Sequence, residues 1–303
     1  MKREKDTLSL RHQIAKNYRN YLLLLPYMVF FTMFIFLPVI TAVCISFTDF
    51  DLLQMPKFVG IDNYIRLFLE DDIFLTVLKN TIIFAFVTGP VCYVLSFVMA
   101  WLINEINPKI RPIIITIFYA PSISGQLFTI FSFIFSSDNY GLINSFLITW
   151  GIREEPIYWL TDPQKLLSVL IVVQIWMCLG TGFLTFSAGL KGTDRALYEA
   201  ASIDGLRNRV QELWYITLPQ MMPQLLFGAV MQIVSSFTVG SISTALCGSP
   251  TPEYAGDTII TYMGDFVSAR YELGYGSAIA VVLFLLMFFS NKVVSKLLQH
   301  VGQ

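Results

Sequence analysis

The sequence predicts an all-helical integral membrane protein with six transmembrane helices, and three observations lead to this fold class. Of the 303 residues, 55% are hydrophobic and only 14% are charged, whereas soluble domains carry about 25% charged residues. Six mostly apolar runs are each long enough to cross a bilayer as a helix. These runs contain no Asp, Glu, Lys or Arg, so the charge is confined to the segments between them.

The predicted elements follow these runs in order. Residues 1–20 form a basic N-terminal arm with six Lys or Arg and two acids, and residues 21–298 form a single helical membrane domain. The first run is too long for a signal peptide and is expected to be retained, with bends at Pro26 and Pro38. The expected spans cover about residues 21–47, 80–104, 112–137, 166–190, 223–247 and 274–291.

A polar segment at residues 191–221 interrupts the apolar pattern between the fourth and fifth runs. Leu197, Tyr198 and Ala201 recur at helical spacing, and Gly205 suits the left-handed position that ends a helix. A second amphipathic helix follows and leads to Pro219, where a new helix can begin. The segment therefore reads as a short helical hairpin. It is either a solvated loop with local helicity or a surface on which a partner docks.

The distribution of positive charge orients the chain. Six spans place both termini on the same side of the membrane. Fourteen of the 20 Lys and Arg residues lie in the N-terminal arm, the 105–111 turn, the 191–221 hairpin and the C-terminal tail. By the positive-inside rule, both termini and the hairpin are expected in the cytoplasm.

Neutral polar residues in the fourth and fifth runs are candidates for a solute pathway. Hydroxyl and amide groups beside aromatic rings suit a sugar, which presents hydroxyls at its rim and C–H groups on its face. The same residue types also hold membrane helices together, and both interpretations remain open at this stage. The candidates are Gln174, Trp176, Thr181, Gln232, Ser235, Ser236 and Thr238.

Several function classes are disfavoured by the sequence. The charge-free spans argue against an ion-coupled carrier, which normally needs an ionisable group inside the membrane. The chain lacks any Gly-Lys dipeptide, and therefore a P-loop for ATP. Both histidines, His12 and His300, lie near the termini, so we expect no catalytic residues, no metal site and no bound cofactor. Uphill transport would then need energy from a partner.

The hairpin also carries a specific sequence signature. Tyr198-Glu199-Ala200-Ala201, Asp204-Gly205 and Ile216-Thr217-Leu218-Pro219 resemble the EAA loop of binding-protein-dependent ABC importer permeases. Further pieces, among them Phe58-Val59-Gly60 and Tyr140-Gly141-Leu142, resemble the carbohydrate-uptake branch, which includes the larger membrane subunit of the maltose importer. The resemblance covers about residues 20–290. The sequence departs from the family pattern at the hairpin entry, where Gly192-Thr193-Asp194 replaces the usual proline. Unlike the maltose subunit, it also lacks a large folded outer insertion.

The resemblance implies a type I ABC importer permease in a bacterial-type inner membrane. It would pair with a second homologous permease as a heterodimer, with two ATPase subunits that bind ATP and Mg²⁺, and with an extracytoplasmic solute-binding protein. It would not bind nucleic acid. The implied substrate is a sugar or oligosaccharide, with a glycerol-phosphate-type solute as the alternative. The implied coupling positions are Tyr198, Glu199, Ala200, Ala201, Asp204, Gly205 and Pro219, and the implied pathway positions add Cys178 and Met231.

Two other classes remain as alternatives to this reading. A self-contained facilitator or secondary carrier would move solute without an ATPase. A membrane-embedded enzyme would need a constellation of catalytic groups that the sequence lacks.

Overall fold

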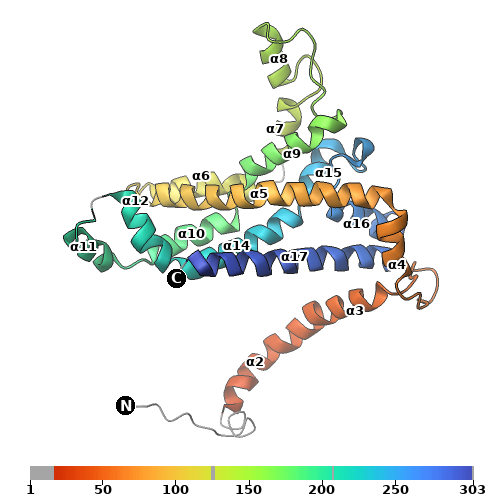
Figure 1. The fold of residues 1–303 in the computed structure, drawn as a ribbon, viewed down its shortest axis with the longest axis horizontal. Coiled ribbons are helices and arrows are strands. Elements are labelled where there is room, and N and C mark those ends of the chain that lie inside the picture. Colours follow the sequence, from red (N-terminus) through yellow and green to blue (C-terminus); the bar gives the residue numbers. More distant parts are fainter. Residues whose placement is uncertain (1–16, 124–126, 207, 302–303) are drawn as a thin grey trace.

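The computed structural model describes residues 17–123, 127–206 and 208–301. Within these ranges the regular structure is helical, apart from an isolated antiparallel bridge between Thr48 and Phe58. Four helices, α5 (Asp72–Asn104), α10 (Thr181–Lys191), α14 (Met222–Phe237) and α17 (Leu273–Val301), pack into an elongated bundle (Figure 1). The short helix α16 (Ile259–Ser268) lies at one end of this bundle, and α11 (Arg195–Ile203) lies at the other.

The remaining helices surround or extend this bundle. They are α2 (Tyr18–Phe31), η1 (Thr32–Phe36), α3 (Leu37–Ile45), α4 (Asp62–Ile65), η2 (Arg66–Glu70), α6 (Arg111–Ile123), α7 (Leu127–Ile134), α8 (Leu142–Thr149), α9 (Pro163–Met177), α12 (Arg209–Glu212), η3 (Leu213–Thr217), α13 (Leu218–Gln220), α15 (Ser241–Cys247) and η4 (Pro252–Tyr254). Helices α7 and α8 project from the side of the bundle, as Figure 1 shows.

Five stretches of the described chain are long and apolar enough to cross a membrane. They are Tyr18–Ile45, Asp72–Asn104, Pro163–Lys191, Met222–Cys247 and Leu273–Leu298. The predicted span at 112–137 is divided between α6 and α7, and residues 124–126 between them lie outside the described chain. Most of the predicted arm, residues 1–16, also lies outside it.

The structure corrects the predicted span boundaries in two ways. Helix α5 begins at Asp72, eight residues before the predicted start at residue 80, because Asp71 caps it by accepting the Phe74 amide at 3.0 Å. The predicted spans 166–190 and 223–247 are each two helices, not one. The chain leaves α9 after Met177 and enters α10 at Thr181, and it leaves α14 after Phe237 and enters α15 at Ser241.

The core consists of three clusters of buried side chains, and α5 contributes to all of them. Phe74 joins α16 and α17, Phe84 joins α9 and α15, and Phe97 joins α10 and α14. The α10–α14 contact is especially close, because a Cβ atom on Gly228 would lie 2.5 Å from the ring of Phe186. Helix α5 is therefore the element against which the rest of the bundle is assembled.

Asp71 connects three helices at the α16 end of the bundle. Its Oδ2 accepts hydrogen bonds from the hydroxyls of Tyr262 in α16 and Tyr275 in α17, both at 2.6 Å. Burial and the bond to this carboxylate raise the pKa of Tyr262. The Arg66 guanidinium lies 4.1 Å from the centre of the Tyr275 ring and pairs with Glu272 at 2.6 Å. Helix α16 thus packs one face, with Ile259, Tyr262 and Phe266 buried, into this network.

The N-terminal helices stand apart from the bundle in Figure 1. No residue of the window that could span the membrane in Tyr18–Ile45 is buried, although α3 contacts α17. The loop after α3 anchors these helices. The amide of Asn63 donates to the carbonyls of Ser46 and Thr48 at 2.9 and 2.8 Å, and the Gly274 amide donates to the carbonyl of Phe50 at 2.9 Å. Helices α2 and α3 therefore expose a long apolar surface, while the C-terminal end of α3 is fixed.

We predict that Asp71→Ala lowers the thermal midpoint of the purified protein in detergent. The variant removes an acceptor from two tyrosine hydroxyls and a helix cap, and a hydrogen bond to a charged group contributes about 1.5–3 kcal/mol. Asp72→Ala is the matched control, because this neighbouring carboxylate is exposed and starts the same helix. Equal midpoints for the two variants would contradict the assigned role.

Candidate functional site

The polar segment 191–221 folds as a capped helical hairpin. The Asp194 carboxylate accepts the Ala196 amide at 3.0 Å and starts α11. Gly205, at φ +97°, reverses the chain, and the Leu206 amide donates back to the carbonyl of Ala201 at 3.0 Å. This is the left-handed helix ending that the sequence predicts. Asn208 then caps α12 by accepting the Val210 amide at 3.1 Å.

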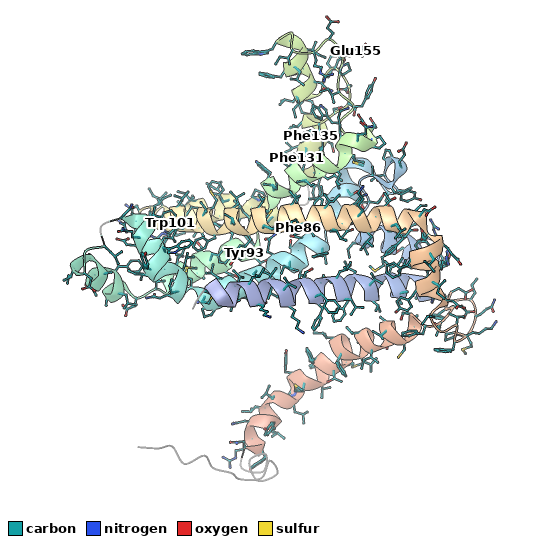
Figure 2. All side chains as sticks on the ribbon, viewed as in Figure 1. Phe86, Tyr93, Trp101, Phe131, Phe135 and Glu155 are labelled. Carbon is teal, nitrogen blue, oxygen red and sulfur yellow. The ribbon has the colours of Figure 1, made fainter. Side chains whose placement is uncertain are left out.

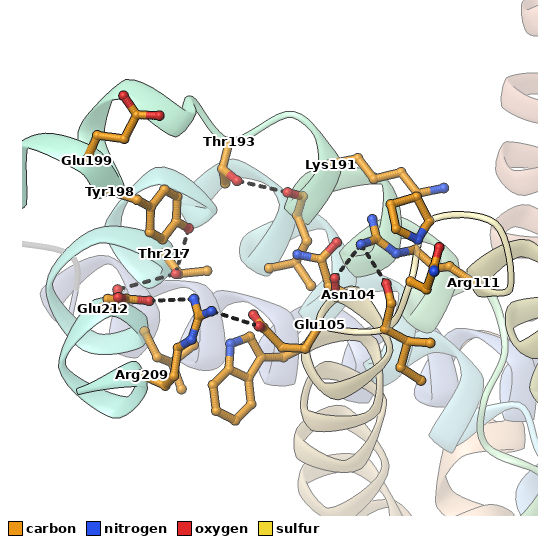
Figure 3. Close-up of a pocket in the computed structure, with 16 residues that line it drawn as sticks. Asn104, Glu105, Arg111, Lys191, Thr193, Tyr198, Glu199, Arg209, Glu212 and Thr217 are labelled. Atoms are coloured by element: carbon orange, nitrogen blue, oxygen red, sulfur yellow. Dashed lines mark hydrogen bonds and ion pairs between the residues drawn. The ribbon is translucent and has the colours of Figure 1, made fainter. Parts of the chain in front are cut away.

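Buried hydroxyls join the two arms of the hairpin. The Thr217 hydroxyl, 2% exposed, contacts the Tyr198 hydroxyl of α11 at 2.8 Å and donates to the Glu212 carbonyl at 3.3 Å. Tyr198 therefore acts as a tie within the hairpin. Figure 3 shows this contact beside the ion pairs of Arg209.

Arg209 attaches the hairpin to the end of α5. Its guanidinium pairs with Glu212 at 2.9 Å and with Glu105, in the α5–α6 turn, at 3.3 Å. The hydrogen bond to Glu212 and then the charge of Glu105 raise the pKa of Arg209, so this cation stays protonated. On the other side of the turn, Arg111 donates to the carbonyls of Asn104 and Ile106 and thereby closes the C-terminus of α5. A hollow of about 560 Å³ lies between the turn and the hairpin (Figure 3).

The remaining predicted coupling positions occupy different faces of the hairpin. Glu199, Ala200 and Asp204 are exposed, and Pro219 is an exposed residue in the first turn of α13. Ala201 is 8% exposed and so faces the protein. Ile203 is 85% exposed, an apolar side chain left on the surface of a polar segment. Sequence reasoning assigned no role to Glu105, Thr217 or Ile203, although Thr217 lies within the Ile216-Thr217-Leu218-Pro219 signature. The apolar Ile203 within a polar run was the other available signal.

A second candidate site is a cavity of about 530 Å³ bordered by α6, α7, α9, α10, α14 and α15, next to the two helix breaks. Irregular backbone at membrane depth is tolerated only where it is buried in protein or faces water. The break after α9 brings Cys178, Gly180 and Thr181 to this cavity, and the break after α14 is followed by Ser241 and Ile242 of α15, which also line it. The other lining residues are Tyr119, Ser122, Phe128, Gln174, Met177, Gly182, Met231, Gln232, Val234 and Ser235.

The structure separates the predicted pathway residues into two groups. Six of them, Gln174, Cys178, Thr181, Met231, Gln232 and Ser235, come together around the cavity. Trp176, Ser236 and Thr238 are absent from its described lining. Trp176 packs edge-on against Phe131 with ring centres 5.1 Å apart. Ser236 donates to the Gln232 carbonyl at 2.8 Å and Thr238 donates to the Val234 carbonyl at 2.8 Å, so each hydroxyl bonds to the backbone of its own helix.

The chain is similar to known membrane components of importers. Residues 93–301 match a family model described as "Binding-protein-dependent transport system inner membrane component". The probable ABC transporter permease protein YesP of Bacillus subtilis is 31% identical, over 93% of this chain and 91% of YesP. The arabinooligosaccharides transport system permease protein AraP of Bacillus subtilis is 29% identical, over 93% of this chain and 89% of AraP.

A solved structure shares the fold. One chain of a bacterial ABC transporter involved in the import of the acidic polysaccharide alginate superposes with a TM-score of 0.72. It is 27% identical, over 95% of this chain and 99% of that chain. A second structure of the alginate transporter, in complex with an alginate pentasaccharide-bound periplasmic protein, matches with the same TM-score and 26% identity, over 96% of this chain and 99% of that chain.

We predict that removing the Arg209 side chain loosens the hairpin. Exposed ion pairs contribute about 0.2–1 kcal/mol, so amide exchange of residues 209–217 in Arg209→Ala should accelerate by at most about fivefold. Hydrogen exchange followed by mass spectrometry measures this change. Lys109→Ala is the control, because Lys109 is an exposed cation in the α5–α6 turn that contains Glu105. An acceleration of the same size in both variants would contradict the role of Arg209.

Two adjacent serines test the position of the cavity. Ser235 lines it and is exposed, whereas Ser236 is 2% exposed and hydrogen-bonded to Gln232. A small, water-soluble thiol reagent should therefore add one label to Ser235→Cys beyond the native cysteines, and none to Ser236→Cys. The measurement is the intact mass after labelling in the membrane. Labelling of Ser236→Cys at the rate of Ser235→Cys would show that the cavity is placed wrongly.

Proposed function

The chain belongs to the family of binding-protein-dependent transport system inner membrane components, and we propose how it works within an ATP-driven importer. Its fold is that of a type I ABC importer permease, and its relatives include permeases for arabinooligosaccharides and lactose. We infer that it moves a sugar or oligosaccharide across the inner membrane of a bacterial-type cell. Alternating access through the cavity at the two helix breaks would be coupled to ATP hydrolysis on separate subunits.

The observation that carries this proposal is the hairpin of α11 and α12. It is a small, capped unit that exposes Glu199, Ala200 and Ile203. Tyr198 joins its two helical arms through Thr217, and Arg209 fixes it to the bundle by pairing with Glu105 in the α5–α6 turn. A helix presented in this way fits a surface groove on a partner. We propose that each of two ATPase subunits, which hold ATP and Mg²⁺, receives one such hairpin. Glu199 would face a basic residue there, and the small side chain of Ala200 would allow close approach.

We propose that a second permease subunit covers the apolar surface formed by α2 and α3. Helices α2 and α3 expose apolar side chains over nearly their whole length; α2 stands away from the bundle in Figure 1, while α3 contacts α17. The surface is available to a homologous permease and to lipid. An extracytoplasmic binding protein would deliver the solute at the α16 end. This follows from the positive-inside rule, which places the α11 end and both termini in the cytoplasm.

The proposal is tested by ATP-dependent uptake in liposomes that contain the complete complex and its binding protein. Glu199→Lys should reduce uptake to less than about a tenth, because a like charge opposite a basic residue costs several kcal/mol. Protein level in the membrane should stay unchanged, since Glu199 is exposed. Gly205→Pro should have the same effect, because proline cannot adopt φ +97°.

Two controls make the result specific. Gln211→Lys introduces the same charge at an exposed position of α12 and should leave uptake within about twofold. Liposomes that contain this chain alone should show no solute flux. Normal uptake by both hairpin variants would refute the coupling role. Flux through the chain alone would instead support a self-contained facilitator.

A further inference from the structure

We propose that the cavity at the two helix breaks is suited to an uncharged oligosaccharide and disfavours one that carries uronate or phosphate groups. The inference rests on the proposed function, because it concerns the substrate of the same pathway. It separates this chain from the alginate importer, whose polysaccharide is described as acidic.

The described lining of the cavity contains no ionisable acid or base other than the Tyr119 phenol and the Cys178 thiol. No Lys, Arg or His lies anywhere in residues 112–137, 166–190 or 223–247, so neighbouring turns of these helices also lack a cation. An anion that leaves bulk water for a cavity between membrane helices loses part of its hydration, and an opposite charge nearby compensates for that loss. This chain provides no such charge along its part of the path, whereas a neutral sugar needs only replacement hydrogen bonds.

The helix ends at the cavity do not substitute for a cation. A helix N-terminus carries about half a positive charge and a C-terminus about half a negative charge. At the first break the C-terminus of α9, at Cys178, meets the N-terminus of α10, at Thr181. The second break likewise joins the C-terminus of α14 to the N-terminus of α15. Each break therefore presents opposite partial charges side by side, and their fields largely cancel.

Neutral hydrogen-bonding groups in the cavity are left available. In the described part of the chain, the side chains of Gln174, Thr181, Ser235 and Ser241 make no hydrogen bond to protein, although all four line the cavity. The rings of Tyr119 and Phe128 add apolar surface to the lining. Amides and hydroxyls can donate to and accept from sugar hydroxyls, and aromatic surface suits the C–H face of a pyranose or furanose.

Substrate competition in the reconstituted complex, with its own binding protein, is the first test. Neutral arabino- or galacto-oligosaccharides and oligogalacturonates of equal length serve as probes. We expect ATP-dependent uptake of at least one neutral series at a rate about tenfold or more above the uronates. Uronate uptake at an equal or higher rate would overturn the inference and leave the importer function intact. ATP-independent flux, or no uptake of any saccharide, would overturn the proposed function.

A pair of variants separates the cavity from the selectivity of the binding protein. Ser235→Asp and Ser235→Asn have similar volumes and differ by one negative charge at the cavity wall, while the binding protein is unchanged. For a neutral substrate, the two variants should transport the same probe at rates within about threefold of each other. A loss confined to Ser235→Asp, together with faster uptake by Ser235→Lys, would show that the transported solute is an anion.

Discussion

The bilayer core offers no water to bond with backbone amides and carbonyls, so each of these groups needs a partner within the protein or in a wet cavity. This constraint organises the centre of the protein. Two helices are interrupted at membrane depth, after Met177 and after Phe237. At the second break the Thr258 hydroxyl donates to the Val239 carbonyl at 2.6 Å, and at the first the Gly180 amide donates to the Cys178 carbonyl at 2.8 Å. Cys178 and Gly180 of the first break line the cavity, whereas at the second break the cavity is lined by Ser241 and Ile242, which follow it in α15. The cavity therefore lies beside both points at which the helices are broken.

Helix α5 links this centre to both ends of the molecule. At the α16 end Asp71 starts the helix and binds two tyrosines, and at the α11 end Glu105 receives the ion pair from Arg209. Between them the helix runs for 33 residues and contributes to all three core clusters. The labelled side chains Phe86, Tyr93 and Trp101 show its course in Figure 2. Under the proposed function, a displacement of the hairpin would be passed to a rigid element that borders the pathway helices.

The sequence by itself determined the membrane class, the approximate spans and the hairpin. Charge-free runs of bilayer length have few alternatives to a helix, because only intrahelical hydrogen bonds satisfy the backbone there. The hairpin was predictable because Asp194 and Gly205 are local signals: one caps a helix and the other permits a left-handed turn. These features depend on neighbours in the chain, and so they can be read from the chain.

The tertiary structure alone decided where the spans break and which polar side chains face the cavity. Gln174 and Ser235 border the cavity while Trp176 and Ser236, one or two residues away, pack against the protein. Residue type does not distinguish them, because the same hydroxyl can bond to its own helix or to a solute. The outcome depends on how each helix is rotated against α5, and that rotation is set by contacts between residues far apart in the sequence.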